Sequence, residues 1–184
     1  MNANEQSENH GPDPEQPPMR SAEQLIRDFY TCFQNRDWKG MQACYGDDAF
    51  FYDPVFQDLQ GHEVKAMWEM LVKNARDLQI VFGDIRVDND IGDGVYGSCN
   101  WAATYTFSQT GRRVVNKVKA RFKFEDGKIA EHMDQFDLWK WSRQALGLPG
   151  ILFGWTPPLQ KKIRAMARKN LDKFLTSSGS AGNL

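Results

Sequence analysis

Two segments of the chain place carboxylates inside apolar, strand-like runs. The first, GDDAFFYDPV (residues 46–55), carries Asp53, and the second, DGKIAEHMDQFD (residues 126–137), carries His132 and Asp134. An isolated ionised carboxylate is costly to bury, so such a residue either faces water or serves in a cavity. Desolvation in an apolar cavity raises the pKa of a carboxyl group towards the range that general acid–base chemistry needs. Asp134, Asp53 and His132 are therefore the candidate catalytic residues.

The geometry of the last hairpin decides which way Asp134 faces. Asp126-Gly127 is a hairpin signal, and a simple two-residue turn would pair Asp134 with Lys119 on a wet, basic face. A single bulge reverses this assignment, because a one-residue slip moves every side chain to the other face of the sheet. The sequence leaves both arrangements open. Asp53 likewise has two interpretations, a cavity residue or a turn residue that accepts local backbone hydrogen bonds before Pro54.

The elements that position these residues follow from hydrophobic periodicity. Ser21 with Gln24 is a capping box that starts the first helix, and Asp37 is the expected N-cap of the second. The strand 113–124 alternates between apolar residues and Lys or Arg, as in an antiparallel sheet with one packed face. The first helix follows Ser21 and carries Leu25, Ile26, Phe29, Cys32 and Phe33 at helical spacing. We expect further helices at about 38–45, 62–76 and 157–175, and strands at 49–53, 78–88, 95–108, 113–124 and 128–139.

Composition excludes several classes of protein. A chain of 184 residues with 41% hydrophobic residues can form one domain with a substantial core. The net charge of −1 argues against a nucleic-acid partner. Three unpaired cysteines and three histidines without ligand spacing indicate neither disulfides nor a metal site. No apolar run is long enough to cross a membrane, and no secretory signal is visible, so a cytoplasmic location is expected.

Certain motifs resemble a known family. Residues 22–55, with a D-W-K-G-M turn, DDA and DP, resemble the opening of ketosteroid isomerase and the SnoaL-like polyketide cyclases. DGKIAEHMDQFD resembles the family's G-K-I-x-E-x-x-D strand. The resemblance covers roughly residues 21–140 and points to the nuclear-transport-factor-2-like superfamily. It implies an α+β fold, in which a curved antiparallel sheet wraps around N-terminal helices to form a cone with an apolar pocket. It also implies a homodimer through the sheet and chemistry without a cofactor.

The family's functional residues are only partly present. Asp53 aligns with the catalytic base of ketosteroid isomerase, but that enzyme's oxyanion donors fall on Phe29, next to Tyr30, and near Ala120, so steroid isomerisation is not expected. Asp134 resembles an aspartate of limonene epoxide hydrolase. The arginine and second aspartate of that enzyme would lie near Ala103 and Tyr105, so its mechanism is not expected either.

The chain is expected to divide into four parts: a disordered tail (1–20), the cone domain (21–141), an extension with an amphipathic helix (142–176) and a second tail (177–184). We predict that the pocket binds a small, mostly apolar molecule through Phe29, Tyr30, Tyr52, Trp101 and Tyr105. The function is then Asp-based acid–base catalysis on a polyketide-, terpenoid- or steroid-like substrate. The alternative is a non-catalytic ligand-binding or dimeric interaction module. The basic helix 157–175 leaves peripheral membrane or partner binding open, although we do not expect membrane contact.

Overall fold

The computed structural model describes residues 20–88 and 94–180. Its helices are α1 (Ala22–Gln34), α2 (Trp38–Ala43), α3 (His62–Asn74), α4 (Leu138–Leu146), α5 (Leu148–Phe153) and α6 (Pro157–Ser180). Its strands are β1 (Tyr45–Tyr52), β2 (Leu59–Gln60), β3 (Gln79–Asp88), β4 (Val95–Phe107), β5 (Arg112–Glu125) and β6 (Lys128–Gln135).

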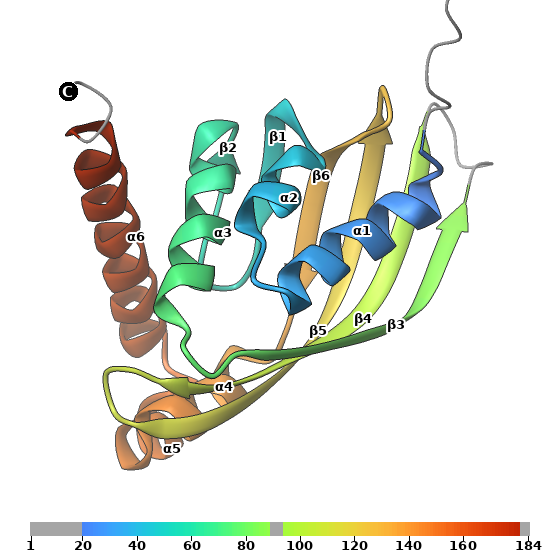
Figure 1. The fold of residues 1–184 in the computed structure, drawn as a ribbon. Coiled ribbons are helices and arrows are strands. Elements are labelled where there is room, and N and C mark those ends of the chain that lie inside the picture. Colours follow the sequence, from blue (N-terminus) through green and yellow to red (C-terminus); the bar gives the residue numbers. More distant parts are fainter. Residues whose placement is uncertain (1–19, 89–93, 181–184) are drawn as a thin grey trace, which may run out of the picture.

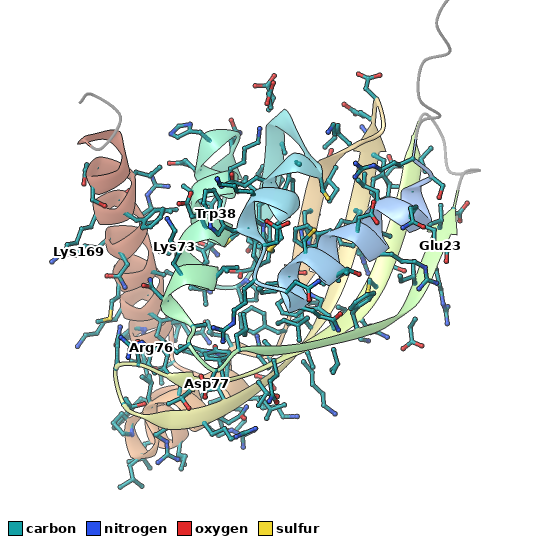
Figure 2. All side chains as sticks on the ribbon, viewed as in Figure 1. Glu23, Trp38, Lys73, Arg76, Asp77 and Lys169 are labelled. Atoms are coloured by element: carbon teal, nitrogen blue, oxygen red, sulfur yellow. The ribbon has the colours of Figure 1, made fainter. Side chains whose placement is uncertain are left out.

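The strands form one curved, unclosed sheet in the order β2-β1-β6-β5-β4-β3. Helices α1, α2 and α3 lie against its concave face (Figure 1). This arrangement confirms the predicted α+β fold with helices enclosed by a curved sheet. One detail differs, because β1 pairs with β6 in parallel whereas the other neighbouring strands are antiparallel. Residues 53–127 separate β1 from β6, which is ample chain for the long crossover that a parallel pair requires.

The N-terminal helices begin where their capping residues predict. Ser21 Oγ accepts a hydrogen bond from Gln24 N at 3.2 Å, and Asp37 accepts one from Gly40 N at 3.0 Å. These bonds satisfy amides that have no partner in the first turn of a helix. The apolar stripe of α1 then forms the centre of the core, with Leu25, Ile26, Phe29, Tyr30 and Phe33 all buried.

Strand β5 separates a packed face from a wet one, as its alternation predicts. The lysines and arginine at 117, 119 and 121 are exposed. The apolar residues of the other face are all buried, namely Val114, Val118, Ala120, Phe122 and Phe124. The face of the sheet that packs on the helices is thereby fixed, and with it the side on which a cavity can form.

A bulge in β6 decides the orientation of the last strand. Ile129 pairs with Phe124, but the next pair along the ladder is Glu131 with Lys123, which leaves Ala130 as the extra residue. His132 therefore lies opposite Phe122. Asp134 lies opposite Ala120, so both side chains point to the packed face. Of the two arrangements left open by the sequence, the structure contains the bulged one.

Several element boundaries differ from those predicted. Strand β6 ends at Gln135 rather than at residue 139, because Asp137 caps α4 by accepting a hydrogen bond from Lys140 N at 2.9 Å. Tyr45 begins β1 instead of ending α2. The expected irregular link after residue 141 contains the short helix α5, and α6 continues to Ser180. Of the predicted tails at 1–20 and 177–184, residues 1–19 and 181–184 lie outside the described residues, whereas residues 177–180 belong to α6.

Three C-terminal helices cover one end of the sheet and one side of α3. Arg112 Nε donates to Gln144 O at 2.7 Å, and Thr110 Oγ1 donates to Ala145 O at 2.6 Å, so the end of α4 is tied to the β4–β5 hairpin. Helix α6 stands beside α3 (Figure 1), where Arg168 forms an ion pair with Glu63 at 2.5 Å. Among the described residues, no helix combines the length and apolar character needed to span a bilayer.

Candidate functional site

Asp134 lies in the interior because its strand is bulged. Its side chain is 3% exposed, on the packed face of β6 two residues beyond His132. The buried carboxylate has partners on two strands, since Oδ1 accepts a hydrogen bond from Trp101 Nε1 of β4 at 3.2 Å and lies 3.1 Å from His132 Nε2. Among the described residues no hydrogen bond reaches Oδ2. One carboxylate oxygen is therefore fixed and the other is available to a ligand.

A chain of hydrogen bonds extends from Asp134 into the core. Trp68 Nε1 of α3 donates to Tyr45 Oη at 2.9 Å, and Tyr45 Oη lies 2.5 Å from His132 Nδ1. A phenol has one hydrogen to donate. A carboxylate only accepts, so Nε2 of His132 carries a hydrogen and donates it to Asp134. In the tautomer with its hydrogen on Nε2, the ring accepts the hydroxyl hydrogen of Tyr45 at Nδ1.

His132 supports Asp134 and does not itself meet the cavity. Its side chain is fully buried. The imidazole lies 4.4 Å from the ring of Phe122, stacks on Trp68 at 5.8 Å and meets Phe29 and Phe51 edge-on, all measured between ring centroids. Such packing holds the ring in one orientation. The predicted catalytic histidine is thus placed to position Asp134 rather than to touch a ligand.

Asp53 follows the end of β1 and closes a tight local turn. Its Oδ1 accepts hydrogen bonds from Val55 N at 2.6 Å and Phe56 N at 2.5 Å, while Asp53 N donates to Phe56 O at 2.8 Å. Both interpretations drawn from the sequence hold, because this turn residue also lines the cavity. Desolvation raises the pKa of Asp53 to about 7 against the opposing effect of the two backbone donors, and the charge of Asp134 adds to the increase.

Asp53 and Asp134 share one cavity of about 1370 Å³ between the sheet, α3 and α6. Its wall combines a few polar groups with many apolar side chains, as is usual for small-molecule sites. Those contributed by the sheet, the N-terminal helices and the turn after β1 include Phe33, Phe51, Phe56, Met67, Trp68, Trp101, Ala103 and Tyr105. Those contributed by the C-terminal part include Trp141, Leu159, Ile163, Met166, Ala167 and Phe174.

The five predicted ligand-binding residues fall into two groups. Trp101 and Tyr105 line the cavity on the inward face of β4. Phe29 and Tyr30 do not line it, because α1 directs them into the core, where Tyr30 stacks on Phe82 at 5.2 Å. Tyr52 also lies off the cavity wall, and its Oη accepts a hydrogen bond from Gln57 Nε2 at 3.2 Å.

Sequence reasoning missed three residues of the site. Tyr45 and Trp68 have the periodicity of ordinary core residues, and their bonding to His132 exists only in the folded chain. Trp141 lies beyond the family motifs, yet its Nε1 donates to Tyr105 Oη at 2.8 Å from α4. The residue types alone could have indicated a role for these three side chains, because buried Trp N–H and Tyr O–H groups usually find hydrogen-bond partners.

Neither the two buried cysteine thiols nor any cluster of possible metal ligands offers a second site for chemistry in the described residues. Burial raises the pKa of the Cys44 thiol to about 12 and that of Cys99 to about 11, so neither is poised as a nucleophile. Within the described part of the chain, no group of three or more His, Cys, Asp or Glu side chains could hold a metal ion.

Comparison with known proteins gives one family match. Residues 26–132 match the model of the SnoaL-like domain, a stretch that includes Asp53 and ends at His132. No curated protein matches the chain significantly.

Solved structures with the same fold come from several bacteria. A putative polyketide cyclase from Pseudomonas putida is 20% identical, with 68% of this chain and 98% of that chain covered and a TM-score of 0.55. An epoxide hydrolase of M. tuberculosis, described as LEH-like, is 22% identical, with 71% of this chain and 94% of that chain covered and a TM-score of 0.51. A protein from Catenulispora acidiphila with a ketosteroid isomerase-like fold, in complex with trimethylamine, is 12% identical, with 72% and 97% covered and a TM-score of 0.57. At these identities the likeness extends to the fold alone.

Proposed function

The chain belongs to the SnoaL-like domain family, and from that premise we propose that it catalyses a cofactor-independent rearrangement of an apolar ketone, such as an isomerisation or a ring closure. Asp134 is the general base and Asp53 is the general acid. The observation that carries this proposal is the presence of both carboxyl groups on the wall of one cavity, in contrasting surroundings. Paired carboxyl groups whose environments differ are the usual basis for dividing acid and base roles.

The roles follow from the hydrogen bonds of the two groups. Asp134 Oδ1 receives N–H donors from Trp101 and His132, which stabilise the charged carboxylate that a base must be. Asp53, with a pKa of about 7, holds its proton in a large share of molecules near neutral pH. Asp134 would remove a proton from the carbon next to the carbonyl, and Asp53 would give its proton to the carbonyl oxygen, forming a neutral enol. Asp134 then gives its proton to another carbon while the Asp53 carboxylate takes back the enol proton, which completes an isomerisation and restores both groups.

The cavity wall sets the class of substrate. Aromatic and aliphatic side chains of the sheet, α3 and α6 dominate it, so a hydrophobic skeleton would fill most of the space. The volume of about 1370 Å³ exceeds the range of about 300–1,000 Å³ typical of small-molecule pockets. A polycyclic or long-chain molecule with one polar end suits it better than a small metabolite.

Hydrogen exchange tests the proposal without knowledge of the natural product. The protein is incubated in D₂O with a panel of cyclic β,γ-unsaturated ketones and 1,3-diketones, and mass spectrometry measures deuterium uptake at carbon. Wild-type protein should accelerate exchange of at least one panel member. Asp134→Asn should slow that exchange by about 10²–10⁴-fold, the usual contribution of a positioned acid or base, and Asp53→Asn by at least about tenfold.

Asp84→Asn is the matched control. Asp84 is a β3 carboxylate outside the cavity that accepts a hydrogen bond from Asn100 Nδ2 at 2.9 Å, and an amide oxygen keeps that bond. This variant should exchange at the wild-type rate. Equal rates for wild type and Asp134→Asn, with both proteins folded, would contradict the proposal.

The second candidate function is a carrier of the same kind of ligand. The favouring observation is the large apolar wall, to which the C-terminal helix adds Leu159, Ile163, Met166 and Phe174. Native mass spectrometry of freshly purified protein separates the two functions. A tightly retained apolar ligand, together with no exchange for any panel ketone, would favour the carrier.

A further inference from the structure

Helix α5 directs its large apolar side chains outward. Leu148, Ile151 and Leu152, with Trp155 just beyond the helix, are 47–72% exposed. Their spacing of i, i+3, i+4 and i+7 places them on one stripe. Phe153, at 56% exposed, extends this surface, which is called here the α5 patch.

Glycines explain why the patch faces outward. Gly150 and Gly154 lie against α4, where an added Cβ at Gly150 would be 1.9 Å from Ser142 O and one at Gly154 would be 2.0 Å from Ser142 Oγ. No larger residue fits on that side. The short helix is therefore fixed with its smallest residues inward and its largest apolar residues in solvent, the reverse of an ordinary surface helix. Contiguous exposed apolar surface of this kind marks an interaction site.

The charges around the patch indicate the kind of partner. Residues 138–171 contain seven Lys or Arg residues and no Asp or Glu. Lys140, Lys161 and Lys162 are exposed, and no ion pair in the described ranges involves them. A surface that exposes Trp, Phe and Leu, with exposed lysines near it in the sequence, matches the interface of an anionic lipid bilayer.

A second copy of the chain fits this surface less well. A two-fold symmetric contact through the α5 patch would bring the same basic residues of both copies together. Like charges placed opposite one another oppose association. An anionic bilayer instead supplies the opposite charge for the lysines and an apolar phase for Trp155 and Leu152.

We propose that the protein docks on anionic membrane surfaces through the α5 patch and takes its apolar ligand from the bilayer. The cavity and the patch are adjacent in the chain, because Leu146, Leu159 and Lys162 line the cavity on either side of the patch in the sequence and Pro149 lines it from within α5. This proposal departs from the sequence-based expectation of no membrane contact. The docking stands on the patch alone, whereas the transfer of ligand rests on the proposed function.

Vesicle flotation tests the docking without any substrate. The probes are vesicles of phosphatidylcholine with about 30% phosphatidylglycerol, compared with vesicles of phosphatidylcholine alone, at low and high salt. The wild-type protein should float with the anionic vesicles at low salt, with at least tenfold weaker binding to neutral vesicles. The chain has six tryptophans, so brominated lipid should quench part of the wild-type fluorescence, and Trp155→Phe should remove that quenching, since the Trp155 ring enters the interface.

Two double variants test the two parts of the patch. Leu152→Glu with Trp155→Glu, and Lys161→Glu with Lys162→Glu, should each weaken flotation at least tenfold. Each variant has a control that makes the same change of charge at exposed positions of the sheet. The control for the apolar pair is Val81→Glu with Val115→Glu, and the control for the lysine pair is Lys117→Glu with Lys119→Glu. Both controls should float like wild type. All variants alter exposed side chains, and circular dichroism checks their fold.

Three outcomes would overturn the proposal. The first is the absence of flotation by folded wild-type protein at low salt. The second is equal flotation of the patch variants and their controls. The third is self-association in analytical ultracentrifugation that the Leu152→Glu/Trp155→Glu variant abolishes, which would identify the patch as a contact between copies. Loss of deuterium exchange in Asp134→Asn with unchanged flotation would leave docking intact, so the two proposals fail separately.

Discussion

The imidazole Nε2 of His132 lies 3.1 Å from Oδ1 of Asp134, while its Nδ1 lies 2.5 Å from the hydroxyl of Tyr45. One ring therefore links a carboxylate on the cavity wall to a phenol in the core. With the ring hydrogen of His132 on Nε2, the bonds run in one direction, from tryptophan to tyrosine to histidine to aspartate. The orientation of the candidate base is thus set in part by His132 and Tyr45, which do not line the cavity.

His132 should act on catalysis only through Asp134. His132→Gln should lower kcat for exchange of a responsive ketone about 10–100-fold while leaving KM nearly unchanged, because Asp134 loses its fixed orientation. A double-mutant cycle separates positioning from general damage. In the Asp134→Asn background the His132 substitution should cost almost nothing further. A full additional loss in that background would contradict the positioning role.

Two buried tyrosines provide a matched comparison of stability. Tyr45 bonds to both Trp68 and His132, whereas the hydroxyl of Tyr30 is buried without a hydrogen-bond partner among the described residues. Tyr45→Phe should lower the free energy of unfolding by about 1–3 kcal/mol, because it leaves buried polar groups unpaired. Tyr30→Phe should leave it unchanged or raise it by about 1 kcal/mol. Urea unfolding of both variants measures the difference, and equal losses would contradict the network.

Asp53 should reduce stability as the pH rises. Burial raises its pKa in the folded protein to about 7 from 3.8, so the unfolded chain loses the proton first, and folding becomes less favourable between about pH 4 and 7. Asp53→Asn removes this cost and keeps an acceptor for Val55 N and Phe56 N. Relative to wild type, its free energy of unfolding should be higher at pH 8 than at pH 4 by roughly 2–4 kcal/mol. Urea titrations at both pH values test this, and a pH-independent difference would contradict it.

The pH dependence of exchange should identify the acid. If Asp53 donates a proton, kcat/KM must fall as the pH rises through about 7, because the required protonated form disappears. Initial rates from pH 5 to 9 with one ketone measure the profile. Asp84→Asn should show the same midpoint as wild type. A rate that instead rises through pH 7 would assign Asp53 the role of base.

The register of β6 beyond Ala130 should be essential to the site. Inserting a second alanine after Ala130 would move every later pair by one residue and turn His132 and Asp134 towards the wet face. We expect loss of cooperative unfolding, measured by circular dichroism and urea titration. Deleting Ala130 is the matched control, because continuous pairing then keeps Asp134 opposite Ala120 and should retain the fold. A stable, active insertion variant would show that this register does not set the orientation.

The sequence by itself determined the fold and its local elements. The features behind this prediction are local: the alternation of β5, the caps at Ser21 and Asp37, and the motifs around Asp53 and Asp134. Local features can be recognised from consecutive residues alone. They predicted the α+β fold and the side of the sheet that is buried. The cytoplasmic location and the homodimer through the sheet stay predictions.

Only the tertiary structure decided how the candidate residues meet. Whether Asp134 faces the cavity depends on one unpaired residue, Ala130, and two-residue periodicity carries no information about a bulge. Tyr45 and Trp68 join His132 from different elements, so their bonds depend on packing between distant segments. The outward stripe of α5 is set by the contact of two glycines with Ser142, which steric fit decides and hydrophobic pattern does not.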